Sequence, residues 1–291
     1  MGLLRRYSAV LLLLGVLGWL LCNEWRAGRS SAVGEGPILT AETVSLTFDA
    51  FLYSQQLRRK LLRSFCAQRA EVSGFRQLVR FLRLRANARH RLVYCGSPGT
   101  GTTDWERALE ILNDVPAEAG MLVNESAPSA LPDGDLSWKD VDTIDRLPPS
   151  YTKVIFVRHP FQRLISAYSH RRFAGEPLEM FVQRALGEGT AAEESAGWRP
   201  LVQMCQPCFV RYDYVVAHGL LEQELGHLLR RLGFPEQAGL PPFRDSEESL
   251  WSQRLMDQHL GHLPAWLLNH LLRFYRGDFA AFNFTHGLTL N

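Results

Sequence analysis

The stretches VYCGSPGTGTTDW (Val93–Trp105) and VIFVRHPFQRLISAY (Val154–Tyr168) decide the fold of this chain. Each one begins with an apolar run of strand length, passes through a polar turn and continues with a helical pattern. Strands that alternate with helices in this way are typical of parallel sheets with helices on both faces. We therefore predict an α/β fold with a three-layer parallel sheet and a ligand at the carboxyl ends of the strands.

The first stretch predicts an anion site. A strand over Arg91–Cys95 leads into a turn with glycines at positions 96, 99 and 101, and a helix is predicted over Thr103–Leu112. The first amides of a helix lack partners within the helix, and the helix dipole adds partial positive charge there. Because glycines let the backbone approach a phosphate closely, this turn is a candidate phosphate cradle. Thr102 and Thr103 add hydroxyl donors.

The second stretch repeats the arrangement with a basic residue at the turn. A strand is predicted over Lys153–Val157, and Pro160 can open the next helix. Arg158, at the end of the strand, offers a planar fork of donors that suits a phosphate. The helical spacing predicts a buried apolar stripe, with Arg163 and Ser166 facing a cleft.

The glycine-rich turn is also a near miss to the P-loop of nucleoside triphosphatases. In that loop a lysine and then Ser or Thr follow the second glycine, whereas Thr102 occupies the lysine position here. The next apolar strand ends in Arg158 instead of a magnesium-binding aspartate. A P-loop kinase is therefore the weakest of the functional hypotheses.

The two motifs resemble those of the Golgi carbohydrate sulfotransferases, the group that includes the chondroitin and dermatan 4-O-sulfotransferases and the human natural killer epitope sulfotransferase. The segment Arg158–Tyr168 matches the family pattern nearly throughout, with Gln162 where glutamate is usual. The resemblance covers roughly residues 90 to 284. Its later parts are Trp198–Pro200, the Cys205–Cys208 segment, Tyr212–Tyr214 and Phe274–Phe282.

This resemblance implies a sulfotransferase-type fold, PAPS (3′-phosphoadenylyl sulfate) as sulfonate donor, no metal, and a glycan acceptor such as GalNAc or a related sugar. By resemblance, Pro98–Asp104 would hold the 5′-phosphosulfate, and Arg158 with Ser166 the 3′-phosphate. The predicted cofactor-binding residues are Pro98, Gly99, Thr100, Gly101, Thr102, Thr103, Asp104, Arg158, His159, Pro160, Phe161, Gln162, Arg163, Leu164, Ile165 and Ser166.

Departures from the family pattern raise an alternative function. Gly99 stands where the family has a lysine that is expected to stabilise charge on the leaving group. Thr102 replaces a family cysteine, and Gly197 stands where a histidine usually precedes Trp198. The alternative is a catalytically impaired luminal protein that binds or regulates other transferases. In an active enzyme, backbone amides near Gly101, with help from Arg163, would replace the lysine.

No residue is assigned as the general base for the acceptor hydroxyl. An imidazole has a suitable pKa, so the candidates include three histidines. His159 lies inside a phosphate motif and is better explained as a structural or phosphate contact. The other candidates are His170, His218, Asp104 and Glu106.

The N-terminal sequence predicts a membrane anchor. We expect a cytoplasmic tail over residues 1–6, a signal-anchor over 7–22, a stem over 23–40 and one luminal domain over 41–291. The uncharged run of residues 7–22 reaches about 24 Å as a helix, which suits a thin membrane. Preceding arginines favour a type II orientation in the Golgi membrane. A signal peptide cleaved near residues 27–32 is the alternative.

Four of the five cysteines lie beyond the anchor, in the predicted oxidising lumen: Cys66, Cys95, Cys205 and Cys208. Four cysteines allow three pairings. A local bridge between Cys205 and Cys208 would leave Cys66 to pair with Cys95, and a zinc site is disfavoured because there is a single C-x-x-C. Asn124 and Asn283 begin glycosylation sequons.

The net charge is only +2, but basic residues gather in one segment. Residues 58–91 hold eleven Lys or Arg and one acid, and this basic arm is either a glycan-attracting surface or the solvated face of an amphipathic helix from Leu57 to Leu82. A nucleic acid partner is not expected in the lumen. Further predictions are a helix over Leu220–Leu232 and one or two helices over Ser246–Tyr275, interrupted by Gly261 and Pro264. A strand is predicted over Tyr212–Val216, and a loop or lid over Ala127–Pro149 beside the acceptor cleft.

Overall fold

The computed structural model describes residues 45–68, 81–95, 99–113, 131, 133–169, 175–187, 197–234, 256 and 258–285. The chain divides into two units, Met1–Ser45 and Leu46–Asn291, and the fold described below is that of the second. The predicted tail, signal-anchor and stem lie outside the described residues, as does the sequon at Asn124. Within the described ranges, no helix has the length and apolar character needed to cross a membrane.

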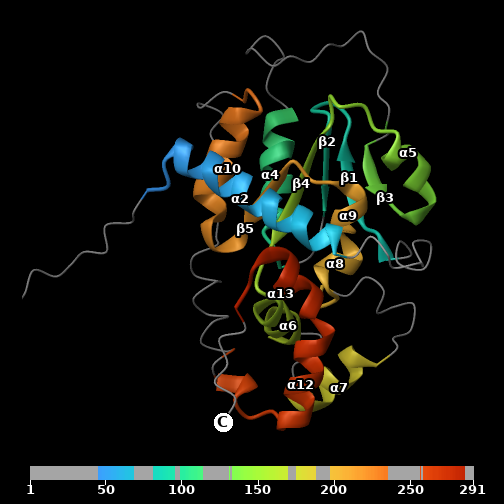
Figure 1. Ribbon diagram of the computed structural model, residues 1–291, viewed down its shortest axis with the longest axis vertical. Coiled ribbons are helices and arrows are strands. Elements are labelled where there is room, and N and C mark those ends of the chain that lie inside the picture. The colour runs from blue at the N-terminus through green and yellow to red at the C-terminus, as the bar shows by residue number, and fades with distance from the viewer. Residues whose placement is uncertain are drawn as a thin grey trace, which may run out of the picture. The chain divides into compact units, whose positions relative to one another are not determined.

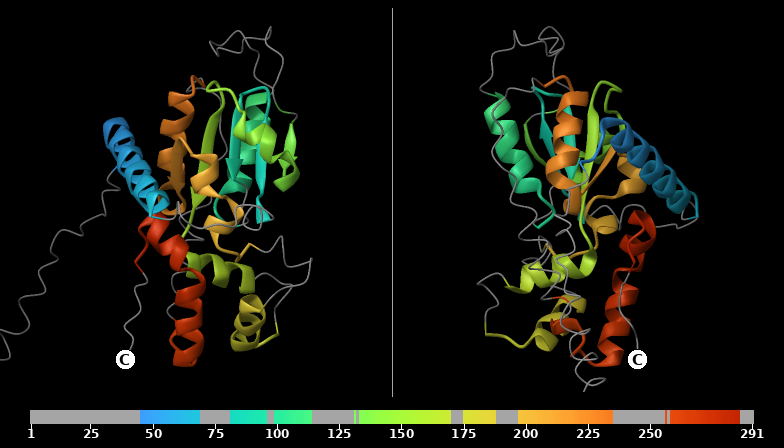
Figure 2. Two further views of the ribbon diagram at one scale, coloured as in Figure 1. Left: turned by 45° about the vertical axis from the view of Figure 1, so that its right-hand side comes forward. Right: turned by 90° about the vertical axis from the view of Figure 1, so that its left-hand side faces the viewer.

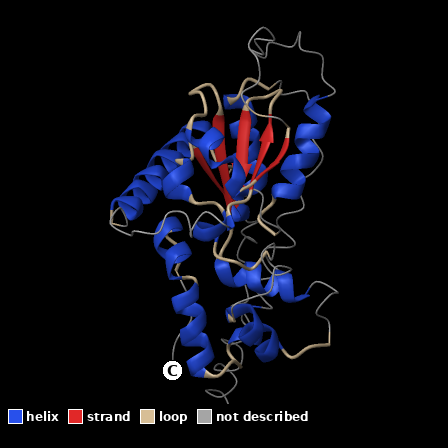
Figure 3. Ribbon diagram, turned by 90° about the vertical axis from the view of Figure 1, so that its right-hand side faces the viewer, coloured by secondary structure: helices blue, strands red, loops and turns tan. Residues whose placement is uncertain are grey.

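A five-stranded mixed sheet forms the centre of the second unit, with the strand order β3-β1-β2-β4-β5 (Figure 3). The strands β2, β4 and β5 are parallel, and β1 runs antiparallel to both β2 and β3. Their bounds are β1 Leu84–Asn87, β2 Leu92–Cys95, β3 Gly134–Leu136, β4 Thr152–Val157 and β5 Tyr214–Ala217. The predicted fully parallel sheet is therefore wrong at β1, which runs opposite to both of its neighbours. The reason is the short connection from β1 to β2, because a tight turn can join only antiparallel strands.

Helices cover both faces of the sheet, which confirms the predicted three layers (Figures 2 and 3). Side chains alternate along β4: Val154 and Phe156 join one hydrophobic cluster, and Ile155 and Val157 join another. The first cluster includes residues of α4 (Thr102–Asn113) and α10 (Leu221–Arg231). The second includes residues of α2 (Phe48–Ala67), α8 (Leu201–Met204) and α9 (Pro207–Val210).

A third hydrophobic cluster joins helices that lie beyond one end of the strands (Figure 1). It contains residues of α6 (Pro160–Ser169), α7 (Leu178–Leu186) and α12 (Ala265–Phe274), together with Tyr275. The remaining described elements are η3 (Trp138–Asp140), α5 (Val141–Asp145), η5 (His218–Leu220) and α13 (Arg276–Phe282). Because α6 directly follows β4, this helical cluster fixes the direction in which the second motif leaves the sheet.

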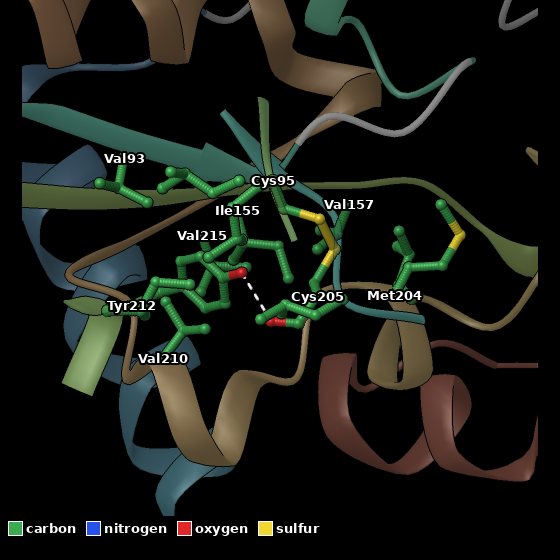
Figure 4. Close-up of a cluster of buried hydrophobic side chains, with 14 of the residues drawn as sticks. Val93, Cys95, Ile155, Val157, Met204, Cys205, Val210, Tyr212 and Val215 are labelled. Atoms are coloured by element: carbon green, nitrogen blue, oxygen red, sulfur yellow. Dashed lines mark hydrogen bonds between the residues drawn. A yellow bond between two sulfur atoms is a disulfide. The ribbon is translucent and has the colours of Figure 1, made fainter. Parts of the chain in front are cut away.

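Two disulfides connect distant parts of the domain. Cys95 at the end of β2 pairs with Cys205, and Cys66 near the end of α2 pairs with Cys208. The local Cys205–Cys208 bridge considered from the sequence is therefore wrong. The first disulfide is enclosed by the second hydrophobic cluster, where the Tyr212 hydroxyl donates a hydrogen bond to the Cys205 carbonyl at 2.6 Å (Figure 4). Both bridges thus join the α8–α9 segment to the layers around it.

The basic arm does not form one long helix. Helix α2 ends at Ala67, and strand β1 begins at Leu84, so the predicted amphipathic helix through Leu82 is wrong. Arg58 on α2 forms an ion pair with the fully buried Glu224 of α10 at 2.7 Å. This cation of the arm therefore binds one helix to another. Residues 69–80 lie outside the described residues.

Most other predicted elements occur with shifted ends. The predicted strand over Tyr212–Val216 begins two residues later, and the helix predicted over Leu220–Leu232 is α10. In the predicted 246–275 helix, α12 begins after Pro264, at the expected break. The region predicted as a loop, residues 127–149, is wrong in part, because β3, η3 and α5 lie within it.

Candidate functional site

The two motifs meet at the carboxyl ends of adjacent parallel strands. Cys95 of β2 pairs in register with Ile155 of β4, so the turns that follow both strands leave the same edge of the sheet. There the Arg158 side chain donates a hydrogen bond from Nη1 to the Gly99 carbonyl oxygen at 2.8 Å. Arg158 is only 1% exposed, although it carries a permanent charge. The arginine predicted to contact phosphate is thus attached to the loop predicted to cradle it.

Ser166 reaches the same place from α6. A side-chain carbon added at Gly99 would lie 3.5 Å from Ser166 Oγ and 3.7 Å from Arg158 Nη1. Ser166 is half-buried, so its hydroxyl lies beside the loop and near the guanidinium. The structure therefore brings together Gly99, Arg158 and Ser166, which are 67 positions apart at most.

Helix α4 directs its N-terminus toward this loop. It begins at Thr102, and its first turn is closed by the hydrogen bond from the Trp105 amide to the Gly101 carbonyl at 3.2 Å. A helix of this length presents backbone amides and partial positive charge at its start. The Thr103 side chain is exposed there, whereas Thr100 and Thr102 are buried. Asp104, in the same turn, pairs with Arg107 at 3.2 Å.

The shape of the loop depends on Gly101. Its φ is +91°, a left-handed conformation that side chains disfavour. A side-chain carbon at this position would lie 2.3 Å from Leu221 Cδ2, at the start of α10. The loop therefore packs against the start of α10, a contact that no local sequence pattern predicts. Gly99 also has a positive φ, +76°.

The apolar residues of the second motif anchor α6 in the protein core. Phe161, Leu164 and Ile165 are fully buried in the third hydrophobic cluster, and Pro160 opens α6 as predicted. Their side chains face the core, so a ligand would contact this segment through its backbone and through the half-buried Gln162 and Ser166.

Arg163 does not face a cleft, and that prediction is wrong. Its guanidinium is fully buried and contacts the carboxylate of Asp278, which is equally buried, at 3.3 Å. Its Nη2 also donates to the carbonyls of Gly197 at 2.6 Å and Arg199 at 2.5 Å. Burial lowers the pKa of Arg163, and the negative charge of Asp278 opposes that shift. Arg163 therefore serves the protein's own packing.

Asp278 organises this buried group. Besides Arg163, its carboxylate accepts hydrogen bonds from the backbone amides of Leu201 at 2.8 Å and Val202 at 2.9 Å. These amides begin α8, so Asp278 caps that helix from α13. Sequence inspection found its motif, Phe274–Phe282, but not this role. An acidic residue placed 115 positions after Arg163 carries no local signal.

The candidate bases are used by the protein or lie outside the described residues. In His159, Nδ1 lies 3.3 Å from the Phe161 amide, and Nε2 lies 2.9 Å from the Thr285 carbonyl. These two contacts hold the start of α6 to the C-terminal segment. His218 is buried. Pro98 and His170 lie outside the described residues.

Comparisons with known proteins decide the family. The model described as "Sulfotransferase family" matches residues 83–285, which include the loop, Arg158, Ser166 and Asp278. The chain belongs to the sulfotransferase family. This family member is 27% identical to carbohydrate sulfotransferase 8 of Mus musculus over 80% of its own length and 64% of that protein's. It is 24% identical to carbohydrate sulfotransferase 9 of Homo sapiens, with 80% and 60% covered.

A third relative of this sulfotransferase-family chain is carbohydrate sulfotransferase 11 of Rattus norvegicus. The identity is 24%, with 79% of this chain and 76% of that protein covered. The chain thus spans less than two thirds of the length of the first two relatives. No solved structure matches it. In the described part of the chain, no three His, Cys, Asp or Glu side chains gather as a metal site would require.

Proposed function

We propose that this chain is a PAPS-dependent carbohydrate sulfotransferase, which transfers a sulfonate group to a hydroxyl of a glycan such as one bearing GalNAc. The observation that carries the proposal is the convergence of Gly99, Arg158 and Ser166 at the carboxyl ends of β2 and β4. Membership of the sulfotransferase family and the names of its relatives support the reaction and the acceptor class.

The residues fit the phosphate groups of PAPS. Arg158 offers a buried guanidinium, Ser166 a hydroxyl, and α4 the positive end of its dipole, all around a loop whose glycines leave its backbone accessible. We assign residues 98–104 to the 5′-phosphosulfate, and Arg158 with Ser166 to the 3′-phosphate. The remaining residues of the second motif position these groups.

When bound, PAPS supplies a sulfonate group on a phosphosulfate anhydride, whose transfer to a hydroxyl leaves a phosphate. The backbone amides at the start of α4 would stabilise the negative charge left on that phosphate. Arg158 adds positive charge from the adjacent strand, held in place by the Gly99 carbonyl. Arg163 does not contribute to this charge at the loop, because Asp278 and two carbonyls engage it in the interior.

A specific observation favours a second function. Gly99 replaces the family lysine, and its φ of +76° is a conformation that a lysine adopts only with strain. The loop is therefore built for glycine, and the positive charge of the lysine is absent from it. The second candidate is a luminal protein that keeps nucleotide or glycan binding without catalysis and regulates active transferases.

The proposal extends to the compartment. Two disulfides that join distant segments are typical of proteins that fold in an oxidising lumen. We place the chain in the Golgi membrane as a single-pass type II protein, with the domain from residue 41 onward in the lumen. Asn283, the second sequon asparagine, is exposed and available for glycosylation.

A sulfonate transfer assay separates the two candidates. The full-length chain in detergent is incubated with labelled PAPS and chondroitin, dermatan or GalNAc-terminated acceptors. We expect transfer by the natural chain, loss of transfer in Arg158→Ala, and retention in Arg230→Ala, which removes an exposed charge at the end of α10.

Absence of transfer together with retained binding of the product nucleotide PAP (adenosine 3′,5′-bisphosphate), and activity restored by Gly99→Lys, would establish the regulatory candidate. A carbon at Gly99 makes only ordinary contacts of 3.5 Å or more, so the cost of that variant is the strain of its positive φ. Magnesium-dependent hydrolysis of a nucleoside triphosphate would instead revive the P-loop hypothesis.

A further inference from the structure

A cavity lies on the face of the sheet that α8 and α9 cover. Its volume is about 970 Å³, and α5, α9 and the junction of α12 with α13 contribute to its walls. In Figure 1, α9 and α8 lie beside the strands, with α13 and α12 below them. Lys153, near the start of β4, lines the cavity together with Val202 and Gln203 of α8. The cavity lining includes none of Gly99–Asp104, Arg158 or Ser166, so it is distinct from the proposed nucleotide site.

The charge of this cavity is strongly one-sided. Four cations line it, namely Lys153, Arg211, Arg273 and Arg276, against the single carboxylate of Asp145. None of these four side chains forms an ion pair or a side-chain hydrogen bond with any described residue. Lys153 is half-buried, and the three arginines are exposed. Uncompensated cations around a concave surface raise the local concentration of anions.

The rest of the lining is apolar and aromatic, with a few amides. Phe65, Phe209 and Phe274 contribute rings, and Gln203 and Gln206 contribute carboxamides. The Gln206 side chain donates to the Gln203 carbonyl at 2.8 Å, which holds it within the wall. Aromatic rings pack against the apolar C–H face of a sugar, carboxamides bind hydroxyls, and cations bind sulfate or carboxylate groups. A simple anion would contact only the cations, and the aromatic rings and carboxamides would have no role in binding it.

We propose that this cavity binds an acidic sugar of a glycan chain, one that carries a sulfate ester or a uronic acid carboxylate. The combination of aromatic wall, carboxamides and four cations carries the inference. The choice of a glycan, in preference to another ring with acidic groups, rests on the proposed function. The cavity binds a sugar of the glycan other than the one that carries the reacting hydroxyl, and so selects acceptors that are already acidic.

Binding of a chondroitin 6-sulfate hexasaccharide to the full-length chain in detergent tests this inference, measured by calorimetry without nucleotide. The variant Arg273→Glu/Arg276→Glu reverses two charges of the cavity, and we expect it to raise the Kd about tenfold or more. The matched control Arg230→Glu/Arg231→Glu makes the same change at the end of α10, outside the cavity, and leaves the Kd within about twofold. Thermal unfolding of each variant checks its folding.

A second pair of variants keeps the test decisive if the double reversal unfolds. Arg273→Lys/Arg276→Lys preserves both charges and should bind the hexasaccharide, whereas Arg211→Glu reverses a charge on a different wall and should weaken binding. Neutral chitohexaose should not bind, and inorganic sulfate should compete only weakly.

Equal weakening in the cavity variant and the control would overturn the proposal in favour of net charge alone. Competition by inorganic sulfate as strong as that by the hexasaccharide would also overturn it, because the cavity would then be a simple anion site. Titration with PAP separates this inference from the proposed function. Retained PAP binding without hexasaccharide binding refutes the cavity assignment alone, and loss of PAP binding alone refutes the nucleotide site.

Discussion

Removal of the Asp278 carboxylate should destabilise the domain severely. This carboxylate is fully buried and serves three donors: Arg163 Nη1 at 3.3 Å and the amides of Leu201 and Val202 at 2.8 and 2.9 Å. Asp278→Ala leaves a buried guanidinium without its counterion and removes the acceptor for two amides at the start of α8. Breaking a buried ion pair by removing one partner costs about 3–5 kcal/mol. A domain of ordinary stability has about 5–15 kcal/mol in total.

The expected change is visible by thermal unfolding of the full-length chain. For a domain of this size, each 1 kcal/mol lowers the Tm by about 2–4 °C, so Asp278→Ala should lower it by about 6–20 °C. Asp278→Asn keeps the shape of the side chain and one acceptor oxygen but loses the charge. Its Tm should therefore lie between those of the natural chain and Asp278→Ala. Circular dichroism at 222 nm follows the loss of helix.

The double variant Arg163→Met/Asp278→Leu is the internal control. It replaces both charged partners with apolar side chains, and so should be less destabilised than the sum of the single variants. If Asp278→Ala unfolds within about 2 °C of the natural chain, the carboxylate does not hold α6, α8 and α13 together as we describe. If the double variant loses as much stability as the two single variants together, Arg163 and Asp278 are not coupled, and that part of the account is refuted.

Three further predictions concern other described residues. Gly101→Ala should cost about 1–3 kcal/mol in denaturant unfolding, since φ is +91° and the new carbon would overlap Leu221; a cost below 0.5 kcal/mol (about the error of such a measurement) would contradict this. Burial lowers the pKa of His90 below 6.5 despite its hydrogen bond to Asn113, so the unfolded chain binds the proton more readily. The free energy of unfolding should therefore fall as the pH drops below about 6.5, and His90→Gln should flatten that fall. Cys208→Ser opens a disulfide that spans 142 positions and should cost about 2–5 kcal/mol under oxidising conditions; an unchanged Tm would argue against this pairing.

The sequence predicted those features that short-range patterns encode. The apolar run before the glycine-rich turn and the one before Arg158 identified β2 and β4, and Pro160 identified the start of α6. These segments have a strand period, a turn composition and a helix signal that stand next to one another. The juxtaposition of the two turns followed from parallel pairing, which places like ends of strands at one edge.

Features that depend on distant partners were beyond local patterns. The spacing of Arg163 placed it on the polar side of α6, yet Asp278 and two carbonyls draw it into the interior. Cys205 and Cys208 looked like a local pair because they are close in sequence. Their partners in β2 and α2 are 110 and 142 positions away, and only the layer arrangement brings them together.

Titration with PAP tests the central claim most directly, namely that the loop after β2 and Arg158 after β4 form a nucleotide-phosphate site. We predict that the full-length chain binds PAP, that Arg158→Met weakens binding by about 30-fold or more, and that Lys153→Met leaves it unchanged. The truncation removes a buried charge beside the bound phosphate, whereas the control removes an equal charge at the far end of β4. Failure of the natural chain to bind PAP, or equal weakening by both variants, would contradict the account.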